Sequence, residues 1–567
     1  DPTTEPRRQP GPAVGLPRPA LTHRADIDGL RAVAILLVVA YHARVPGFAG
    51  GYIGVDVFFV LSGYLITRLI VAEADRSGSV HLGRFWLRRF RRLFPAAATV
   101  IASVLVASLL IESPLEWRAR TESAFASLTY WSNHLFAREV GSYFSPDVET
   151  NPFLHTWSLA VEEQFYFLWP VLFFLLGLFV DARRPSGRTV RVGATAGFTA
   201  ASFLASLRLT GDGSSLGFYS ALSRAWQFGA GALLAMAMVS LAASAQPGSG
   251  GPLPAETRRR LTAIGVAVLV VAMIVIDDTT RYPGTAALLP VVATLAFLAA
   301  EPADRFVGGA LRSGPARTIG LVSYSWYLWH WPVIVLGTVH LGSDSAGVRT
   351  LLAGAALLPA AITYRMVENP VRRSPRLARS PRATLLVLGG FAVVALALMG
   401  LARLRADQAA DDPLVAALAD ARADLTRLDG VCTLLEPEPL RTHCSAGPLD
   451  TAPTVLLIGD SHAAHWLPAV DSAVAELGWG RIASVRVSCP SIAFGWAGAE
   501  PECVDRQQQL PELIERLGPD LVVMSHSAGY VDDDRDDLDR WRSTLAGFAR
   551  TLEDLDTGLL VLLDVPR

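Results

Sequence analysis

The chain has 567 residues, of which 51% are hydrophobic and only 18% are charged, and its mean hydropathy is +0.35. Soluble domains carry about 25% charged residues, so this composition excludes a disordered chain and an ordinary cytosolic protein. Residues 407–567 hold 28 acidic residues against 12 Arg, whereas the residues before them have a net charge of +14. This asymmetry predicts two parts in two environments. The Arg clusters are short and separated by apolar runs, so nucleic acid is not an expected partner.

The first 404 residues are dominated by long apolar segments. Residues 1–24 are an exception: they are rich in Pro and Arg, lack the apolar core of a signal peptide, and are expected to form a disordered cytoplasmic tail. A membrane-spanning helix needs about 20 mainly apolar residues. Eleven segments fit, centred near Leu37, Phe59, Val104, Phe167, Ala200, Leu233, Leu269, Val291, Trp329, Leu357 and Val394. Residues 25–404 are therefore predicted to form a polytopic α-helical membrane bundle.

The distribution of Arg among the loops predicts the orientation of this bundle. Arginines collect in alternate loops, such as Arg84–Arg92, Arg258–Arg260 and Arg372–Arg382, whereas the loops between them, such as Ser113–Asn151, are poor in Arg for their length. Cytoplasmic loops are enriched in Arg and Lys, so the N-terminus is predicted to lie in the cytoplasm. With an odd number of spans, everything after about Arg403 is predicted to lie outside the cytoplasmic membrane.

Several predicted spans carry ionisable side chains, which are costly in a membrane and by default indicate a functional cavity. Arg31 and His42 lie eleven residues apart, about 16 Å along one face of the first span. Two similar polar stripes follow: His155, Ser158 and Glu162 in the fourth span, and Ser323, Tyr327 and His330 in the ninth. Four further charged residues complete the set: Asp28, Asp56, Arg224 and Glu368. The alternatives are hydrogen bonds that hold the helices together and, for His42, a satisfied core histidine.

These motifs resemble the acyltransferase-3 family of integral membrane acyltransferases over about residues 26–400. The matching segments are Asp28–Arg31 with His42, Gly54–Gly63, Arg84–Arg92, His155–Tyr166 and Tyr327–Pro332. The resemblance implies an acyl-CoA donor in the cytoplasm, usually acetyl-CoA, and functional roles for Arg31, His42 and the Arg cluster. No metal is expected.

Roles for individual residues follow from this resemblance. Arg84, Arg88, Arg91 and Arg92 are expected to bind the CoA phosphates, because guanidinium groups match phosphate oxygens, although the positive-inside rule also accounts for the cluster. His42, with Arg31 and Glu162, is expected to be catalytic, either by deprotonating the acceptor hydroxyl or by carrying the acyl group itself. The expected cavity residues are Asp28, Asp56, His155, Ser158, Arg224, Tyr327, His330 and Glu368.

Beyond the last span, residues 405–450 are predicted to form an extracytoplasmic helical stalk, followed by an α/β domain over residues 451–567. Four apolar runs predict buried parallel strands: Val455–Ile458, Ile482–Val487, Leu521–Met524 and Leu559–Leu563. Helices such as Leu510–Leu517 and Trp541–Leu552 are expected between them. All four cysteines lie in this half, which fits an oxidising compartment. We favour the short-loop pairs Cys432–Cys444 and Cys489–Cys503 over the other two pairings and over four free buried thiols.

The first predicted strand runs into Gly459-Asp460-Ser461-His462. A serine at the carboxyl end of such a strand points into the crevice where open α/β sheets bind ligands, and neighbouring backbone N–H groups can stabilise an oxyanion. The tetrapeptide resembles block I of the flavodoxin-like SGNH hydrolase family, and its fusion to an acyltransferase-3 domain resembles bacterial surface-polysaccharide O-acetyltransferases. Ser461 is therefore the expected nucleophile, with Gly459 and Ser525 at the oxyanion hole and Asp460 in a structural role.

A base for Ser461 is not found at the usual spacing, because no His after Asp407 follows an Asp by three residues. We therefore expect a natural segment beyond Arg567 to supply the catalytic His and Asp. The alternatives are that His465 or His526 serves as the base, or that the domain is an inactive binding module.

These features predict a membrane O-acyltransferase. It would move an acetyl or other acyl group from cytoplasmic acetyl-CoA to a hydroxyl of an exported cell-envelope glycan or glycolipid, and the SGNH-like domain would complete the transfer outside. The alternatives are a membrane-anchored envelope esterase, and a transporter that uses the same polar cavity.

Overall fold

The computed structural model describes residues 23–139, 150–179, 185–211, 214–244, 252–302, 304–416, 433–434, 444–449, 451–486, 489–493, 501–527 and 535–562. The chain divides into two compact units, Asp1–Ala409 and Ala410–Arg567. Nearly all of the expected tail (residues 1–24) and much of the expected stalk lie outside the described residues.

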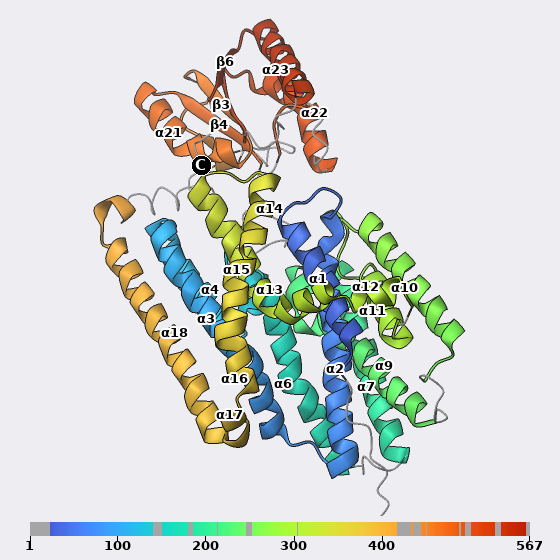
Figure 1. Ribbon diagram of the computed structural model, residues 1–567. Coiled ribbons are helices and arrows are strands. Elements are labelled where there is room, and N and C mark those ends of the chain that lie inside the picture. The colour runs from blue at the N-terminus through green and yellow to red at the C-terminus, as the bar shows by residue number, and fades with distance from the viewer. Residues whose placement is uncertain are drawn as a thin grey trace, which may run out of the picture. The chain divides into compact units, whose positions relative to one another are not determined.

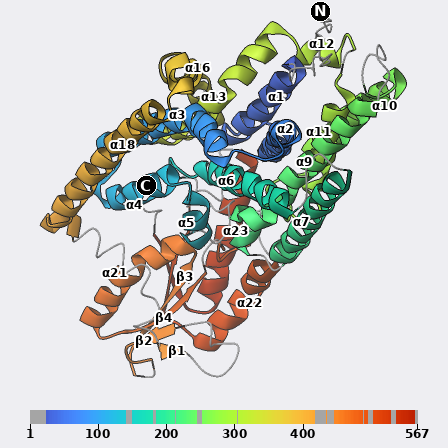
Figure 2. The same cartoon turned by 90° about the horizontal axis from the view of Figure 1, so that it is seen from below.

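The described part of the first unit is helical (Figures 1 and 2). Its helices are α1 (Ala25–His42), α2 (Gly54–Ser77), α3 (Leu82–Ile111), α4 (Pro114–Leu128), α5 (Ser132–Glu139), α6 (Thr156–Phe179), α7 (Pro185–Gly211), α8 (Ser215–Tyr219), α9 (Ala221–Ser244), α10 (Ala255–Val275), α11 (Leu288–Ala300), α12 (Val307–Leu311), α13 (Gly314–Leu341), α14 (Ala346–Ala355), α15 (Leu357–Thr363), α16 (Asn369–Arg373), α17 (Pro375–Arg379) and α18 (Pro381–Ala410). A 3-10 turn, η1 (Ala49–Ile53), precedes α2, and a π-helical turn, η3 (Tyr364–Glu368), follows α15.

All eleven predicted centres fall in helices of this unit. Among the described residues, seven helical segments are long and apolar enough to cross a membrane: Ala49–Ser77, Leu82–Ile111, Thr156–Phe179, Ser186–Gly211, Ser215–Ala242, Ala346–Arg379 and Pro381–Ala410. The helix Leu288–Ala300 is apolar but shorter, and α1, α10 and α13 are not among the seven. The chain is thus a polytopic membrane protein, while the number of eleven spans and their orientation stay predictions.

Residues Ser113–Asn151, which we expected to form a loop, contain the two helices α4 and α5. The Ser113 side chain accepts a hydrogen bond from Leu115 N, and proline occupies the first turn of α4, a combination that favours helix initiation. The turn between the two helices rests on α6, because the Gln164 amide donates to Tyr130 O and to Asn133 Oδ1, both at 2.9 Å. The pair α4–α5 therefore packs into the bundle (Figure 2).

Helix α1 packs against α13 and α2, and α2 packs against α9. These contacts are close because glycines stand at the crossings. A methyl group on Gly320 of α13 would lie 1.9 Å from Asp28 O of α1, and one on Gly63 of α2 would lie 2.0 Å from Phe228 O of α9. Small residues allow such approach between membrane helices, so these glycines let α13 pack closely on α1 and α2 on α9.

The second unit contains a six-stranded sheet in the order β1-β2-β4-β3-β5-β6. Its elements are β1 (Thr433–Leu434), β2 (Cys444–Ala446), β3 (Thr454–Gly459), α21 (Ser461–Leu477), β4 (Gly480–Val485), α22 (Pro501–Leu517), β5 (Leu521–Ser525), α23 (Arg535–Asp554) and β6 (Gly558–Val561). Strands β4, β3, β5 and β6 are parallel, and β1 and β2 add an antiparallel edge. Both of these edge strands lie within residues 405–450, where we expected a stalk.

Alternate side chains of β3 face opposite layers. Leu456 and Ile458 pack with α22 and α23, whereas Val455 and Leu457 pack with α21. The unit is thus an α/β/α sandwich, as predicted. Strand β6 is parallel as expected, but it is not buried: it forms the edge of the sheet, and Leu560 is 46% exposed.

A disulfide joins Cys489 and Cys503, with 5.6 Å between their Cα atoms, which is the pairing we favoured for these two residues. Cys444 is also disulfide-bonded, and Cys432, its expected partner, lies outside the described residues. No described cysteine has a free thiol.

Candidate active site

A cavity of about 80 Å³ lies inside the helical unit, and five helices line it. Its polar lining comes from α1, α2, α3, α6 and α13: Arg31, Ser62, Arg89, Arg92, Ser158, Glu162, Tyr166, Ser323, Tyr324 and Tyr327. Three arginines face one carboxylate, so the cavity carries a positive charge. A buried cationic cavity suits an anionic ligand.

Glu162 is the acidic centre of this cavity. Its carboxylate accepts hydrogen bonds from the hydroxyls of Ser62 and Tyr166, and Tyr166 Oη lies 2.8 Å from Ser62 Oγ. The guanidinium of Arg89 lies over the Tyr166 ring, 4.4 Å from its centroid, a cation–π geometry. The Glu162 carboxylate is thus held by two hydroxyl groups, and one of them belongs to the tyrosine whose ring contacts the Arg89 guanidinium.

A second group of contacts joins α1, α6 and α13. Arg31 donates to Ser323 Oγ at 3.0 Å, and the hydroxyls of Ser158 and Tyr327 are 2.6 Å apart. The stripes predicted on the fourth and ninth spans therefore face each other in the structure.

Three buried histidines lie next to this group. His42 Nδ1 and His330 Nε2 are 2.9 Å apart, and His330 Nδ1 is 2.7 Å from Tyr327 O. The ring of His155 is centred 5.7 Å from that of His330, and neither of its ring nitrogens has a hydrogen-bond partner among the described residues. Although His42 does not line the cavity, Tyr327 and His330 connect it to the cavity wall.

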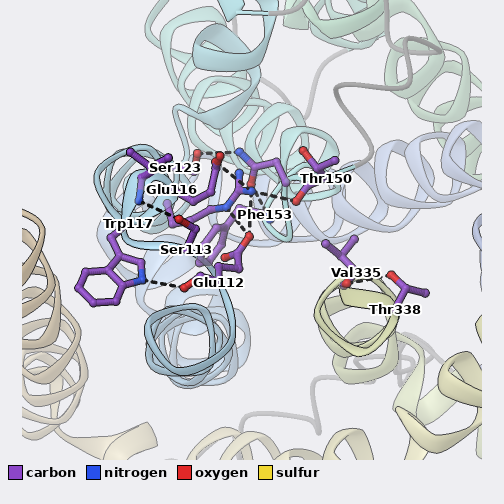
Figure 3. A network of polar contacts seen from close by, with 12 residues as sticks. Glu112, Ser113, Glu116, Trp117, Ser123, Thr150, Phe153, Val335 and Thr338 are labelled. Carbon is purple, nitrogen blue, oxygen red and sulfur yellow. Dashed lines mark hydrogen bonds and ion pairs between the residues drawn. The ribbon is translucent and has the colours of Figure 1, made fainter. Parts of the chain in front are cut away.

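A second polar network holds the segment before α6 in place (Figure 3). Arg120 of α4 lies 2.8 Å from a carboxylate oxygen of Glu112 and donates to Thr150 O at 3.1 Å. Asn151 donates to Ser123 Oγ at 2.9 Å and accepts from Trp331 Nε1 through its carbonyl, also at 2.9 Å. Because the Trp331 ring is centred 4.6 Å from that of His42, this network fixes one wall of the His42 environment.

Asp56 and Arg224 were expected in the cavity but belong to a separate group of ion-paired and hydrogen-bonded residues. Arg224 lies 3.2 Å from Asp56 Oδ1, and Tyr282 and Gln227 donate to the same carboxylate at 2.6 and 2.5 Å. Both ion-pair partners are 1% exposed. A buried pair with every oxygen satisfied holds helices together, so the structure gives these two residues a packing role.

Asp28 and Glu368 also lie outside the cavity lining. Asp28 pairs with His23 at 3.0 Å. Glu368 accepts from Ser325 Oγ at 2.8 Å and lies 3.9 Å from Arg372. These two carboxylates have protein partners of their own.

The predicted Arg cluster divides between two faces of α3. Arg92 lines the cavity together with Arg89, which stands three residues earlier. Arg84 and Arg88 are exposed, and Arg88 pairs with Glu73 at 3.1 Å; Arg91 does not line the cavity. Of the arginines in this cluster, Arg89 and Arg92 are therefore the two that line the cavity.

Our sequence reasoning did not assign Ser62, Arg89, Tyr166 and Tyr324 to the site. Two of them carried a usable signal. Arg89 shares a helix face with Arg92, and Tyr166 extends the stripe of Ser158 and Glu162 by one more turn. Ser62 lies in the family-matching segment Gly54–Gly63 but was not singled out there, and Tyr324 carried no signal, because only the helix packing brings it to the cavity.

In the C-terminal unit, Ser461 is the first residue of α21 and directly follows β3. The Asp460 carboxylate is fully buried and accepts from His462 N at 2.7 Å and from Ser527 N at 2.9 Å, so Asp460 ties the ends of β3 and β5 together. Gly459 has φ +150°, and a methyl group there would lie 2.0 Å from Ser525 O. This position therefore requires glycine.

The two other polar residues at this edge are Ser525 and His526. Ser525 Oγ is buried and has no hydrogen-bond partner among the described residues. His526 Nε2 accepts from Ser491 N at 2.8 Å, and burial lowers the pKa of its imidazole to about 4. A nitrogen that already accepts a hydrogen bond in this way is poorly suited to take a proton from Ser461. The described residue His465 is exposed on α21.

The chain thus has two separate candidate sites: a buried cationic cavity in the helical unit and a serine at a strand-to-helix junction in the α/β unit. The chain belongs to the acyltransferase-3 family: the family model described as "Acyltransferase domain" matches residues 24–366. A second model, "SGNH domain (fused to AT3 domains)", matches residues 430–567. Both resemblances inferred from the sequence motifs are confirmed.

Two relatives show what the chain is similar to. The peptidoglycan O-acetyltransferase OatA of Listeria monocytogenes is 32% identical over 359 residues, which is 62% of this chain and 56% of that protein. The O-acetyltransferase OatA of Staphylococcus aureus is 32% identical over 357 residues, 61% of this chain and 57% of that protein. The match thus spans little more than half the length of these relatives. No solved structure gives a significant match.

Proposed function

We propose that this protein is a membrane O-acyltransferase that transfers an acyl group, usually acetyl, from cytoplasmic acyl-CoA to a hydroxyl of an exported cell-envelope glycan. The observation that carries the proposal is the cavity in which Arg31, Arg89 and Arg92 face Glu162. The phosphates of CoA require fixed cations, and guanidinium groups bind them by paired hydrogen bonds.

The chemistry of this cavity suits acyl transfer. Arg89 and Arg92 would hold the donor, and His42, beyond Tyr327 and His330, would take the proton of the attacking hydroxyl. Glu162, held by Ser62 and Tyr166, would orient groups in the cavity. Acyl-CoA would supply the activated thioester when it is bound; the residues named here would bind it, orient it and move the proton.

The name of the Listeria monocytogenes relative favours peptidoglycan as the acceptor class. In this proposal Ser461 receives the acyl group outside the membrane and passes it to the glycan. The disulfide of the C-terminal unit and the alternating Arg loops support an extracytoplasmic position for that unit.

Acyl transfer from labelled acetyl-CoA by the full-length protein in lipid vesicles tests the proposal. We expect His42→Ala to lower the transfer rate at least ~100-fold, because a positioned general base contributes ~100-fold or more, while leaving the protein folded. His340→Ala is the matched control, since His340 is an exposed histidine in the last turn of α13. Full activity of His42→Ala, or no transfer by the unchanged protein, would contradict the proposal.

A further inference from the structure

A groove separates α3 from α18, two helices that run side by side in both views of the molecule (Figures 1 and 2). It is lined by residues of α3 between Ala98 and Val106 and by residues of α18 between Val387 and Leu398. Its volume is about 730 Å³, against about 80 Å³ for the cationic cavity. We call it the α3–α18 groove.

The lining of the α3–α18 groove is apolar. Its two hydroxyl groups are used within α3, because Thr99 Oγ1 donates to Pro95 O at 2.7 Å and Ser103 Oγ donates to Thr99 O at 2.8 Å. The groove is also open to its surroundings, since Val106 and Val394 are 39% and 59% exposed. Both helices are long and apolar enough to cross a membrane. Water needs polar partners in such a space, so a hydrocarbon chain is the ligand that fits it.

Arg91 continues the groove face of α3 toward the start of that helix. It stands seven and eleven residues before Ala98 and Ala102, and residues at these spacings share one face of a helix. The Nε atom of Arg91 is buried, and the side chain makes no ion pair or hydrogen bond within the described part of the chain. A cation without a counter-charge therefore lies at this end of the groove.

Further arginines lie where α18 begins. Arg379 ends α17 and Arg382 stands in the first turn of α18; both are exposed, and neither has an acidic partner among the residues that the structure describes. The stretch from Asn369 to Ala406 contains no acidic residue at all. Figure 1 shows that α3 and α18 both begin at the lower end of the view, next to α17. The unpaired arginines of the two helices thus lie at the same end of the groove.

We propose that the α3–α18 groove binds one anionic phospholipid, with a hydrocarbon chain between the helices and its phosphate at Arg91, Arg379 and Arg382. Guanidinium groups bind phosphate oxygens by paired hydrogen bonds, and basic residues at the ends of membrane helices attract anionic lipids. A neutral lipid would leave these arginines without an anion, and a free phosphate would leave the groove without a chain. The inference does not depend on acyl transfer.

Native mass spectrometry of the full-length protein in detergent measures which lipid is retained. The probes are phosphatidylglycerol and phosphatidylcholine with identical chains. We expect the unchanged protein to retain one phosphatidylglycerol with an affinity at least ~tenfold above that for phosphatidylcholine, because three arginines contribute to the difference. Equal retention of the two lipids would overturn the inference.

Two neighbouring glycines of α18 test the groove itself. Gly390 lines it and Gly389 does not, and a methyl group on either would meet no heavy atom within 4 Å. Gly390→Phe should therefore fill the groove and lower the affinity for phosphatidylglycerol about tenfold, whereas the matched control Gly389→Phe should change it less than about threefold. Equal affinities of the two variants would contradict a chain in the groove.

The headgroup end is tested by removing charge. Arg91→Gln combined with Arg382→Gln should bring the affinities for the two lipids within about threefold of each other. The control is Arg259→Gln combined with Arg260→Gln, which removes two exposed arginines at the start of α10 and should leave the preference for phosphatidylglycerol intact. An equal loss in both double variants would mean a general attraction of anionic lipids and would overturn the site.

Two measurements on the unchanged protein do not require the variants to fold. Glycerol phosphate, which carries the phosphate without chains, should not displace phosphatidylglycerol; displacement at equal concentration would reduce the site to a free-phosphate site. The mass of the complex should be that of one protein with one lipid. A dimer without bound lipid would show that a second copy of the chain covers the groove, and would also overturn the inference.

Discussion

The two candidate sites of this protein are built in opposite ways. In the helical unit, Arg31, Glu162 and Tyr327 come from three helices that are far apart in sequence, and packing alone makes them neighbours. In the C-terminal unit, Gly459, Asp460 and Ser461 are consecutive residues at a strand-to-helix junction. A site built from consecutive residues can be read from the sequence, whereas a site gathered from distant helices depends on how those helices pack.

The largest expected effect is a loss of stability, and it tests whether Asp56 of the helical unit has a packing role rather than a role in the cavity. Asp56→Asn should lower the free energy of unfolding by about 3–5 kcal/mol, because it leaves the buried Arg224 without its counter-charge. Thermal unfolding in detergent measures this loss. Glu256→Gln is the control: its partners Arg259 and Arg260 are exposed, so we expect a change below about 1 kcal/mol.

If Asp56→Asn instead retains its stability and loses acyl transfer, Asp56 belongs to the cavity after all. That result would extend the candidate active site to include Arg224 of α9, the partner of Asp56.

The second prediction compares two adjacent carboxylates of α6. Glu162→Gln should reduce the rate of acyl transfer ~100-fold, about 2.7 kcal/mol, because the carboxylate that binds Ser62 and Tyr166 loses its charge. Glu163→Gln should change it less than threefold, because Glu163 does not line the cavity. Steady-state rates with acetyl-CoA measure both effects. Equal losses of rate would contradict the prediction that only Glu162 acts in the cavity.

A third prediction concerns pH and the edge of the sheet that bears Ser461. Burial lowers the pKa of His526 to about 4, so the neutral form is favoured in the folded unit. The resulting stability is complete above pH ~6.5, the unfolded value, and is lost as the pH falls toward about 4. We expect a loss of about 2 kcal/mol over this range, measured by hydrogen exchange of β5 in the full-length protein.

His526→Gln provides the comparison for this pH effect. It removes the titrating group, so exchange of β5 should depend less on pH between 6.5 and 4. If the pH dependence of β5 exchange were the same in His526→Gln, groups other than His526 would cause it.

The smallest expected effect distinguishes the two faces of α3. Replacing Arg89 and Arg92 with Gln should raise the KM for acetyl-CoA about tenfold, or about 1.4 kcal/mol, because both side chains line the cavity. The same change at Arg84 and Arg88, which are exposed, should alter it less than threefold. The reverse order would make the exposed face, with Arg84 and Arg88, the donor site.

These comparisons show which parts of the molecule were readable in advance. Apolar segment length located a helix at every one of the eleven expected centres, and short apolar runs located β3, β4 and β5. The helices α4 and α5 were not predicted because polar and apolar residues are mixed in them. Ser113 and Pro114, which favour helix initiation, did indicate the start of α4. The burial of β6 was predicted wrongly, because an apolar run has the same appearance at the edge of a sheet as in its centre.

The sequence by itself determined the local features: the apolar segments, the serine after β3, and the stripes of polar residues on α6 and α13, because each depends on residues one or two turns apart. Only the tertiary structure decided which of the buried polar groups act together. Asp56 and Glu162 are both acidic residues in apolar helices. One is satisfied by Arg224, Tyr282 and Gln227, while the other faces a cavity. The physical reason is that the cost of a buried charge depends on its partners, and here the partners come from other helices.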